Sequence, residues 1–254
     1  MDNGVVIVLG MGEVGQPLFH ILSKKFECAA VDIKPVEIDE PCDVLHICYP
    51  FQVPDFVKTT ARYMEKYNPR LTAIHSTVAP GTTRKTHEIA PGSALVYSPV
   101  RGKHARMESD MLRYKKFVAG FDSKSVEDAQ RHFREAGFQT DTFPTPDIAE
   151  LSKLLETTYF GVLIGWAQEV ERLAAQYDGN YDDVVSFIKE VDFLPSHIFP
   201  GVIGGHCVMP NIAILRQHIK SDFLDAVVNS NQTKAKATAS ENETEPKLEP
   251  TLND

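Results

Sequence analysis

Five apolar residues, Val5-Val6-Ile7-Val8-Leu9, run directly into the glycine-rich segment Gly10-Met11-Gly12-Glu13-Val14-Gly15. The apolar run is mostly β-branched and predicts a buried parallel strand. The glycines predict a tight turn that leads straight into a helix, with Gly12 allowing the backbone to approach a ligand and Gly15 allowing close packing of helix on strand. A strand, such a turn and a helix in this order are typical of a site that holds a pyrophosphate at a helix N-terminus.

An acidic residue supports the same interpretation. The predicted strand Cys28–Val31 ends in Asp32, which follows the first glycine by about 20 residues, the spacing at which a carboxylate accepts hydrogen bonds from a ribose. No arginine comes directly after Asp32, so NAD is favoured over NADP as the cofactor. Tyr49 and Pro50, which follow the third predicted strand, and Thr77, which follows the fourth, are further candidates for contact with NAD. S-adenosylmethionine also uses a glycine-rich loop and an acidic ribose ligand, and it is the alternative cofactor.

Strand and helix signals alternate along the first part of the chain. This alternation predicts an α/β fold, with a Rossmann-type doubly wound parallel sheet that forms a nucleotide-binding domain over residues 1–145. The connection between Asp32 and Asp43 is rich in proline and acidic residues. We therefore expect one crossover helix to be short or absent there.

A smaller all-helical domain is expected over residues 146–228. It begins with one long helix, at 147–177, for which Asp147 is a candidate N-cap and Glu150 completes the pattern of a capping box. Apolar residues recur along this helix at steps of three and four: Leu151, Leu155, Tyr159, Val162, Trp166, Val170 and Leu173. Such a stripe belongs to the core or to a subunit interface. We expect a homodimer through this helix, because a long helix in a small protein is stabilised by a partner.

The remaining residues, 229–254, contain few apolar side chains. They cannot bury enough surface to offset the entropy of ordering, so we expect a disordered tail.

Composition excludes several classes of function. The chain has 254 residues, of which 43% are hydrophobic, and a net charge of -9 that argues against binding to nucleic acid or to an anionic membrane. A small-molecule substrate, including an anionic one, remains compatible with this charge. The four cysteines do not have the spacing of metal ligands, so we expect no metal site. We find no signal peptide and no apolar run near the ~20 residues that span a bilayer, and we expect a cytoplasmic protein.

Three further segments carry residues suited to chemistry. Ser76-Thr77-Val78-Ala79-Pro80-Gly81-Thr82 follows a predicted strand directly, where ligands of open α/β sheets bind. Lys153 lies on the long predicted helix, and Gly204-Gly205-His206-Cys207 presents a thiol on a glycine turn. Taken singly, these residues are typical of turns, of a solvated charge and of a small buried side chain.

Their order along the chain resembles that of the UDP-glucose/GDP-mannose dehydrogenase family, whose members are NAD-dependent enzymes that oxidise a C6 alcohol of a nucleotide sugar to an acid. Each segment is similar to one of the family's motifs. The cofactor segment with Asp32 comes first, and the loop Ser76–Thr82 looks like S-T-V-x-x-G-T. Ser98-Pro99 with Arg101 resembles S-P-E-R, and Glu150-Leu151-x-Lys153 resembles E-L-x-K. Gly204–Cys207 is similar to the loop of the catalytic cysteine.

The resemblance implies a covalent mechanism. Cys207 would attack the aldehyde formed by a first hydride transfer, and the thiohemiacetal would give a second hydride and a thioester that water cleaves. Lys153 would stabilise the oxyanion, and Thr77 would position a water or the substrate hydroxyl. The resemblance likewise suggests Arg101, Thr157 and Asn211 as residues that bind substrate.

The chain departs from the family at three of these positions. Val100 replaces the Glu of S-P-E-R, Thr157 replaces an Asn four residues after the lysine, and Asn211 replaces an Asp four residues after the cysteine. Valine cannot transfer a proton, and asparagine can only donate or accept hydrogen bonds. The resemblance ends near residue 220, so we expect a truncated relative that lacks the C-terminal UDP-binding domain.

Two functions follow from these observations. The first is an NAD-dependent dehydrogenase, an oxidoreductase acting on CH-OH, that oxidises an alcohol of a small or sugar-like substrate, with Cys207 as nucleophile. The second is an NAD-binding scaffold or sensor whose chemistry has decayed. A reactive Cys207 thiol that is needed for turnover would distinguish the first from the second.

Overall fold

The computed structural model describes residues 4–33, 36–192 and 198–244. The chain divides into two compact units, Met1–Leu154 (unit 1) and Leu155–Asp254 (unit 2). Each unit has its own architecture.

Unit 1 contains one sheet with the strand order β2-β1-β3-β4-β5-β6-β7. The strands are β1 (Val5–Leu9), β2 (Cys28–Val31), β3 (Cys42–Ile47), β4 (Leu71–Ile74), β5 (Leu95–Tyr97), β6 (Lys116–Gly120) and β7 (Thr140–Thr142). Neighbouring strands from β2 to β5 are parallel, which confirms the predicted α/β class. The sheet is mostly parallel, and one pair differs: β6 is antiparallel to β5, while β7 is parallel to β6. The chain leaves β5 and enters β6 at the same end of these two strands, so the connection does not have to cross a face of the sheet.

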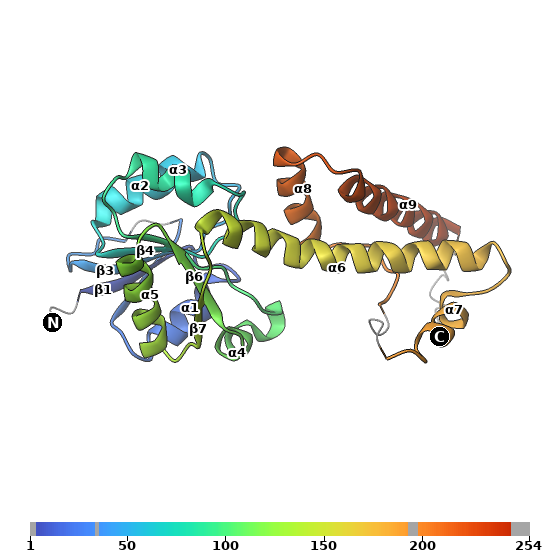
Figure 1. Cartoon of the computed structure of the whole chain (residues 1–254), viewed down its shortest axis with the longest axis horizontal. Helices are drawn as coiled ribbons and strands as arrows, with labels where there is room; N and C mark the ends of the chain where they lie inside the picture. The colour runs from blue at the N-terminus through green and yellow to red at the C-terminus, as the bar shows by residue number, and fades with distance from the viewer. Residues whose placement is uncertain (1–3, 34–35, 193–197, 245–254) are drawn as a thin grey trace, which may run out of the picture. The chain divides into compact units, whose positions relative to one another are not determined.

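Helices cover both faces of this sheet (Figure 1). One face carries α1 (Gly15–Leu22), α4 (Met107–Arg113) and α5 (Ser123–Glu135), and the other carries α2 (Phe56–Tyr67) and α3 (Thr82–Ile89). Alternate residues of the strands therefore enter two cores: Val6 and Val8 pack with α1 and α5, whereas Ile7 and Leu9 pack with α2. Among the residues described between β2 and β3 there is no helix, as the proline-rich connection predicted.

The long predicted helix is present as α6 (Pro146–Ala175). Its first turns belong to unit 1, so the units divide after Leu154 instead of at the expected residue 145. In unit 2 it is followed by α7 (Tyr181–Ile188), α8 (Val208–His218) and α9 (Asp222–Thr244). Gly161 allows α8 to approach α6 closely, since a Cβ at this position would lie 2.7 Å from a methyl of Val208.

The predicted capping box of the long helix is wrong. The side chain that accepts from the helix is Thr145, whose Oγ1 receives a hydrogen bond from the Ile148 N–H at 3.3 Å. Asp147 instead pairs with Arg84 at 2.7 Å, and Glu150 binds a distant loop described below. Tertiary partners thus compete successfully for side chains that a local pattern assigned to the helix end.

The expectation of a disordered tail from residue 229 is also wrong as far as Thr244, where α9 ends, and residues 245–254 lie outside the described part of the chain. Hydrogen bonds fix the part of α9 that follows residue 229 to the rest of unit 2, although few of its side chains are apolar. The Ser230 hydroxyl donates to the Gln168 side chain at 2.9 Å, and Asn231 Oδ1 accepts from the Ile203 N–H at 2.7 Å. Composition alone does not reveal such contacts.

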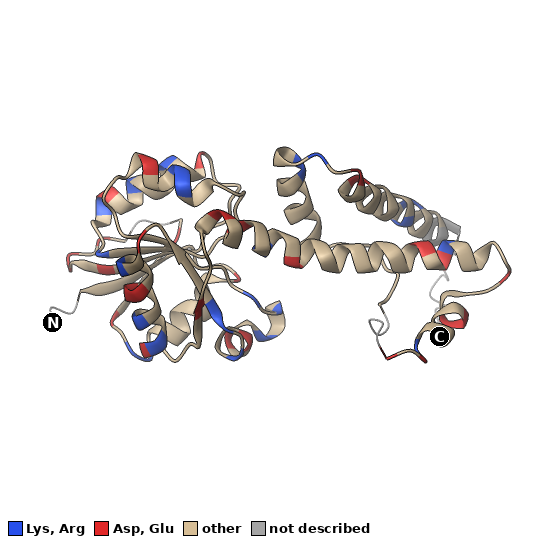
Figure 2. Cartoon of the chain, in the orientation of Figure 1, with Lys and Arg blue, Asp and Glu red and all other residues tan. Residues whose placement is uncertain are grey.

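Acidic and basic residues alternate along the elements of unit 1, whereas residues 157–168 of α6 include neither (Figure 2). Throughout the described residues, every helix is too short or too polar to span a membrane.

Candidate functional site

The glycine turn is held by contacts between backbone atoms. Gly10 has a φ of 91°, and a Cβ on it would lie 2.6 Å from the backbone nitrogen of Tyr49. A Cβ on Gly15 would lie only 1.8 Å from the carbonyl oxygen of Gly10. Both positions therefore exclude any larger residue. Gly15 was expected to allow packing of the helix on the strand, and its nearest neighbour is instead the carbonyl of Gly10 within the turn.

Gly12 is different, because a Cβ there would meet no atom within 4 Å. This open space adjoins the start of α1, where Val14 is the N-cap residue and supplies no side-chain hydrogen bond. The first turn of α1 contains no acidic side chain either. The Gln16 N–H already donates to the Gly12 carbonyl at 3.1 Å, and Pro17 has no N–H. The N–H groups that could meet an anion here are therefore those of the turn that ends at Gly15, where the helix dipole also favours negative charge.

Asp32 lies beside this turn. Leu9 at the end of β1 pairs in register with Val31 on one side and with Ile47 on the other, so the three strands end together. Oδ2 of Asp32 accepts from the Met11 N–H at 2.9 Å, and its Oδ1 accepts from its neighbour's N–H at 2.8 Å. The carboxylate is exposed and retains further lone pairs for a ligand.

Three other candidates for cofactor contact have distinct surroundings. Tyr49 directs its hydroxyl to Thr60 at 2.6 Å, and burial raises the pKa of this phenol, so only the backbone of Tyr49 faces the glycine turn. Pro50 is exposed next to it. Glu13 lies 3.6 Å from the ring of His104 and is directed toward the segment that follows β5.

The loop that carries Thr77 is bound by Glu150 from the start of α6. Its carboxylate accepts hydrogen bonds from the Gly81 N–H at 2.6 Å and from the Thr83 N–H and hydroxyl at 2.8 and 2.6 Å. These contacts cap α3 from 67 residues away in sequence. Burial outweighs the three donors and raises the pKa of Glu150 to about 7. The hydrogen bonds of Glu150 fix the first turns of α6 beside the loop of Thr77. Lys153 lies on the next turn of the same helix.

In unit 2, the structure places Cys207 at the surface, as the N-cap residue of α8. Asn211 lies one turn later and is buried, and its side-chain N–H donates to the Thr157 hydroxyl at 2.9 Å. This hydrogen bond ties the first turn of α8 to α6. The sequence suggested both residues as substrate ligands, and the structure shows them bound to each other.

Comparison with known proteins gives a consistent result. Residues 147–233 match the family model described as UDP-glucose/GDP-mannose dehydrogenase family, central domain. A UDP-N-acetyl-D-mannosamine dehydrogenase of Pyrococcus horikoshii is 25% identical over 177 residues, which is 66% of this chain and 42% of that protein. The enzyme of the same name from Methanocaldococcus jannaschii is 25% identical over 268 residues, which is 81% of this chain and 60% of that protein.

The chain resembles this dehydrogenase family. A solved structure of the Pyrococcus horikoshii enzyme, at 20% identity, superimposes with a TM-score of 0.82 over 93% of this chain and 70% of that chain. This likeness concerns the fold. The chain spans about half the length of the curated relatives that it matches.

The S-P-E-R position of the family shows the sharpest departure. Val100, in place of the acidic residue, is buried in the core against α4 and α5. The guanidinium of Arg101 donates to the Lys115 carbonyl at 2.6 Å and lies 5.0 Å from the centre of the Phe117 ring. Arg101 is thus held against β6, a contact that sequence analysis did not anticipate.

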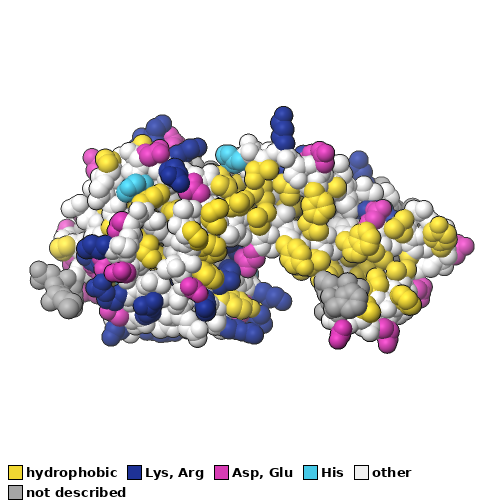
Figure 3. All heavy atoms as spheres, in the orientation of Figure 1, with side chains coloured by type: hydrophobic (Ala, Val, Ile, Leu, Met, Phe, Trp, Pro, Cys, Tyr) yellow, Lys and Arg dark blue, Asp and Glu magenta, His cyan; other side chains and the backbone are white. Residues whose placement is uncertain are grey.

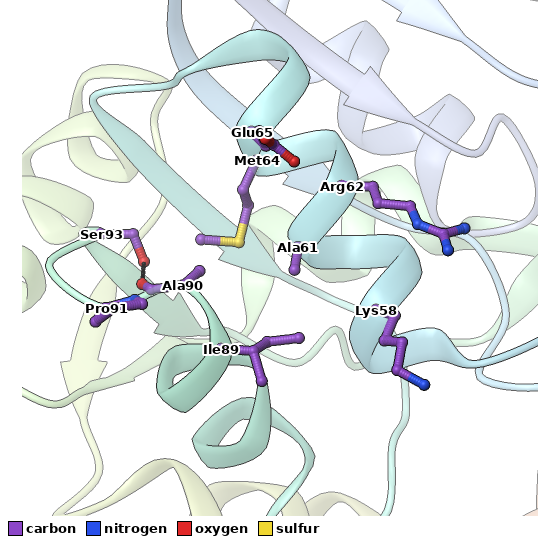
Figure 4. A pocket seen from close by; sticks show the side chains of 9 residues that line it. All are labelled: Lys58, Ala61, Arg62, Met64, Glu65, Ile89, Ala90, Pro91 and Ser93. Atoms are coloured by element: carbon purple, nitrogen blue, oxygen red, sulfur yellow. Dashed lines mark hydrogen bonds between the residues drawn. The ribbon is translucent and has the colours of Figure 1, made fainter.

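A metal site and a surface groove are two other kinds of site that could hold a ligand. No cluster of three or more His, Cys, Asp or Glu side chains that could hold a metal ion occurs in the parts of the chain that are described. A groove of about 520 Å³ lies between α2 and α3, where Met64 and Ile89 line it and Ser93 donates to the Ala90 carbonyl at 2.6 Å (Figure 4). None of the residues lining this groove belongs to the strand ends that carry the glycine turn, Asp32 or Thr77.

Proposed function

We propose that this protein is an NAD-dependent dehydrogenase that oxidises an alcohol of a small or sugar-like substrate. The observation that carries the proposal is the open space at Gly12, beside an uncapped helix N-terminus and the exposed carboxylate of Asp32. A pyrophosphate fits this space, and the carboxylate is placed to accept from ribose hydroxyls. When bound, NAD would supply the hydride acceptor. The resemblance to nucleotide-sugar dehydrogenases supports the class of substrate.

Each proposed catalytic residue has a separate task. Thr77, partly exposed at the end of β4, would hold the substrate hydroxyl or a water. Lys153 would stabilise negative charge on the reacting oxygen. Cys207, exposed at the start of α8, would add its sulfur to the carbonyl carbon of an aldehyde, with the oxygen becoming the hydroxyl of a thiohemiacetal.

The pair Thr157–Asn211 limits the second half of such a reaction. Neither side chain can accept a proton as a carboxylate does, and each satisfies the other by a hydrogen bond. Val100 supplies no acid or base either. We therefore propose that the protein either stops at the two-electron step from alcohol to aldehyde or releases a thioester slowly.

The same departures favour a second candidate, a protein that binds NAD as a scaffold or sensor without turnover. Native mass spectrometry of the protein as purified, followed by NADH formation with a panel of alcohols, separates the two. An enzyme would form NADH, and Cys207→Ala would retain NAD affinity but lose the covalent step. Tight NAD binding without turnover, and a Cys207→Ala variant equal to wild type, would support the scaffold. Absence of NAD binding would overturn both.

We also propose that the protein is a homodimer through the helix predicted at 147–177. Several large apolar side chains of α6 are exposed in the isolated chain, with Tyr159 and Trp166 each 60% exposed. Leu155 and Leu173 continue the same stripe at helical spacing. Figure 3 shows hydrophobic side chains gathered over α6. A contiguous apolar patch of this kind favours a protein partner.

All four cysteines are free thiols. Because free thiols persist in a reducing compartment, we propose a cytoplasmic location.

A further inference from the structure

A chain of hydrogen-bonded basic side chains crosses the core between the sheet and α5. His46 on β3 contacts two other histidines, with 2.9 Å from its Nδ1 to Nε2 of His75 and 3.1 Å from its Nε2 to Nε2 of His132. Nδ1 of His75 lies 2.7 Å from the carbonyl oxygen of Ser98 and 3.2 Å from Nζ of Lys116. Lys116 also donates to the Ser98 carbonyl at 3.0 Å. Four basic groups are thus joined without interruption.

These groups are buried among apolar and aromatic side chains. His46 is fully buried, and Lys116 is 5% exposed, with its Nζ 4.9 Å from the centre of the Phe133 ring. His132 forms the outer end, because its ring lines a basin of about 760 Å³ that is also bordered by Asp43 and Arg70. The chain therefore connects the surface at α5 with the carboxyl end of β5.

Burial lowers the pKa of every member of this chain. It holds the pKa values of His46 and His75 well below the usual range and lowers that of His132 to about 4. Burial also lowers the pKa of Lys116 to about 7. Lys116 is therefore the member of the chain that changes charge near neutrality.

Several charged or titratable groups face the chain. The Cys48 thiol raises and Arg101 lowers the pKa of Lys116. At the other end, Asp43 raises and Arg70 lowers the pKa of His132. Lys116 and the neighbouring rings act on the two inner histidines in the same direction as burial.

The observed contacts fit one set of proton positions, and a second set becomes complete once Nδ1 of His75 moves away from the Ser98 carbonyl. A carbonyl oxygen only accepts, so the 2.7 Å contact requires a proton on Nδ1 of His75. A neutral imidazole has one donor and one acceptor, so His46 then donates from Nδ1 and His132 donates from Nε2. In the second set every one of these protons sits on the opposite atom, and Lys116 is an ammonium that donates to His75 and to Ser98. Nδ1 of His75 and the Ser98 oxygen are then both acceptors, so their 2.7 Å contact lengthens.

We propose that His132, His46 and His75 form a proton relay between the basin and Lys116. To charge the lysine, Nδ1 of His75 gives its proton to the amine and Nε2 of His75 takes one from Nδ1 of His46. Nε2 of His46 takes the proton of Nε2 of His132, whose Nδ1 gains a proton from water. One proton enters and one ammonium forms, so charge and atoms balance without a further reactant. The reverse sequence returns the proton to water.

The relay changes which group donates a hydrogen bond to the Ser98 carbonyl. With a neutral lysine the principal donor is the ring of His75, and with a charged lysine it is the ammonium of Lys116. Ser98 precedes Pro99 and Val100 at the end of β5, and its hydroxyl donates to the Phe117 carbonyl at 2.8 Å. Proton uptake at the surface of α5 is thereby coupled to the hydrogen bond that the residue after β5, Ser98, accepts. This inference concerns unit 1 alone and does not depend on the proposed enzymatic activity.

Nitrogen NMR of the full-length, isotope-labelled protein tests the relay directly. As the pH rises through the pKa of Lys116, His75 and His46 should move their proton from Nε2 to Nδ1, and His132 from Nδ1 to Nε2. All three rings should change with a single midpoint, shared with Nζ of Lys116. Rings that keep their tautomers, become imidazolium ions or change at separate midpoints would overturn the proposal.

A substitution tests whether protons travel along the chain. In His46→Gln the amide can still donate and accept hydrogen bonds, but it cannot pass a proton through itself. Exchange of the Lys116 ammonium with water should slow by at least about tenfold, the effect of about 1.4 kcal/mol on a barrier. His20→Gln, at an exposed position of α1, should leave the rate unchanged. If His46→Gln does not fold, His132→Asn interrupts the outer end. An unchanged exchange rate in the folded variant would show that the proton takes another route.

Discussion

Replacing Glu150 with glutamine changes one buried group and should alter stability in a pH-dependent way. The carboxylate receives three hydrogen bonds from Gly81 and Thr83, yet it has no exposed surface. The amide of Glu150→Gln resembles the protonated acid, because both are uncharged and both place a carbonyl oxygen beside a donating group. The variant therefore compares the charged and uncharged forms of this site within the same packing.

The magnitude follows from the pKa of Glu150. Its rise from the ordinary value of 4.5 to about 7 means that the folded state binds the proton more tightly than the unfolded chain. The contribution of Glu150 to the free energy of unfolding is present below pH 4.5 and is lost as the pH rises through 7. The full pKa difference corresponds to about 3 kcal/mol. Glu150→Gln should match wild type in acid and exceed its stability by up to about 3 kcal/mol above pH 7.

Urea denaturation at a series of pH values measures this difference. Subtracting the two stability curves removes the contributions of the buried histidines, which titrate in the same range and are shared by both proteins. Glu65→Gln, at an exposed position of α2, controls for the loss of one negative charge and should stay within about 0.5 kcal/mol of wild type. A difference that is independent of pH, or a wild type that gains on the variant as the pH rises, would refute the reasoning. It would mean that the three donors outweigh burial.

Three further predictions concern the nucleotide site and the long helix. Gly12→Val should abolish NAD binding in calorimetry yet leave the free energy of unfolding within about 0.5 kcal/mol, since its side chain points into open space; retained affinity would move the cofactor elsewhere. Gly15→Ala should cost about 3 kcal/mol or more in urea denaturation, because its Cβ would lie 1.8 Å from a carbonyl oxygen. A cost below about 1 kcal/mol would contradict this overlap. Tyr159→Glu should convert a dimer to a monomer in sedimentation experiments, and an unchanged mass would reject α6 as the interface.

Features encoded in adjacent residues were predictable from the sequence. The strand Val5–Leu9, the glycine turn and Asp32 form within a single βαβ unit, so their spacing is nearly sufficient to specify their geometry. The long helix was likewise predictable, because its apolar periodicity extends over many turns.

Features that depend on distant partners were not predictable. Glu150 fits a capping box by spacing, but its partner Thr83 is 67 residues away. His46 occupies an apolar strand, and its partner His132 is 86 residues away. A single sequence does not specify which distant polar side chains meet in the core. The helix at 229–244 was missed for the same reason, because Asn231 contacts a backbone segment 28 residues earlier.

Two close approaches of backbone atoms require glycine in this turn: the carbonyl of Gly10 near the α-carbon of Gly15, and the α-carbon of Gly10 near the nitrogen of Tyr49. Side chains at Met11, Glu13 and Val14 play no part in those two contacts. Met11 and Val14 pack against the core, so Glu13 is the position of the three at which a substitution leaves the packing of the turn unchanged. Glu13 can therefore serve contacts outside the turn, such as that with His104, while the close backbone approaches at Gly10 and Gly15 stay the same.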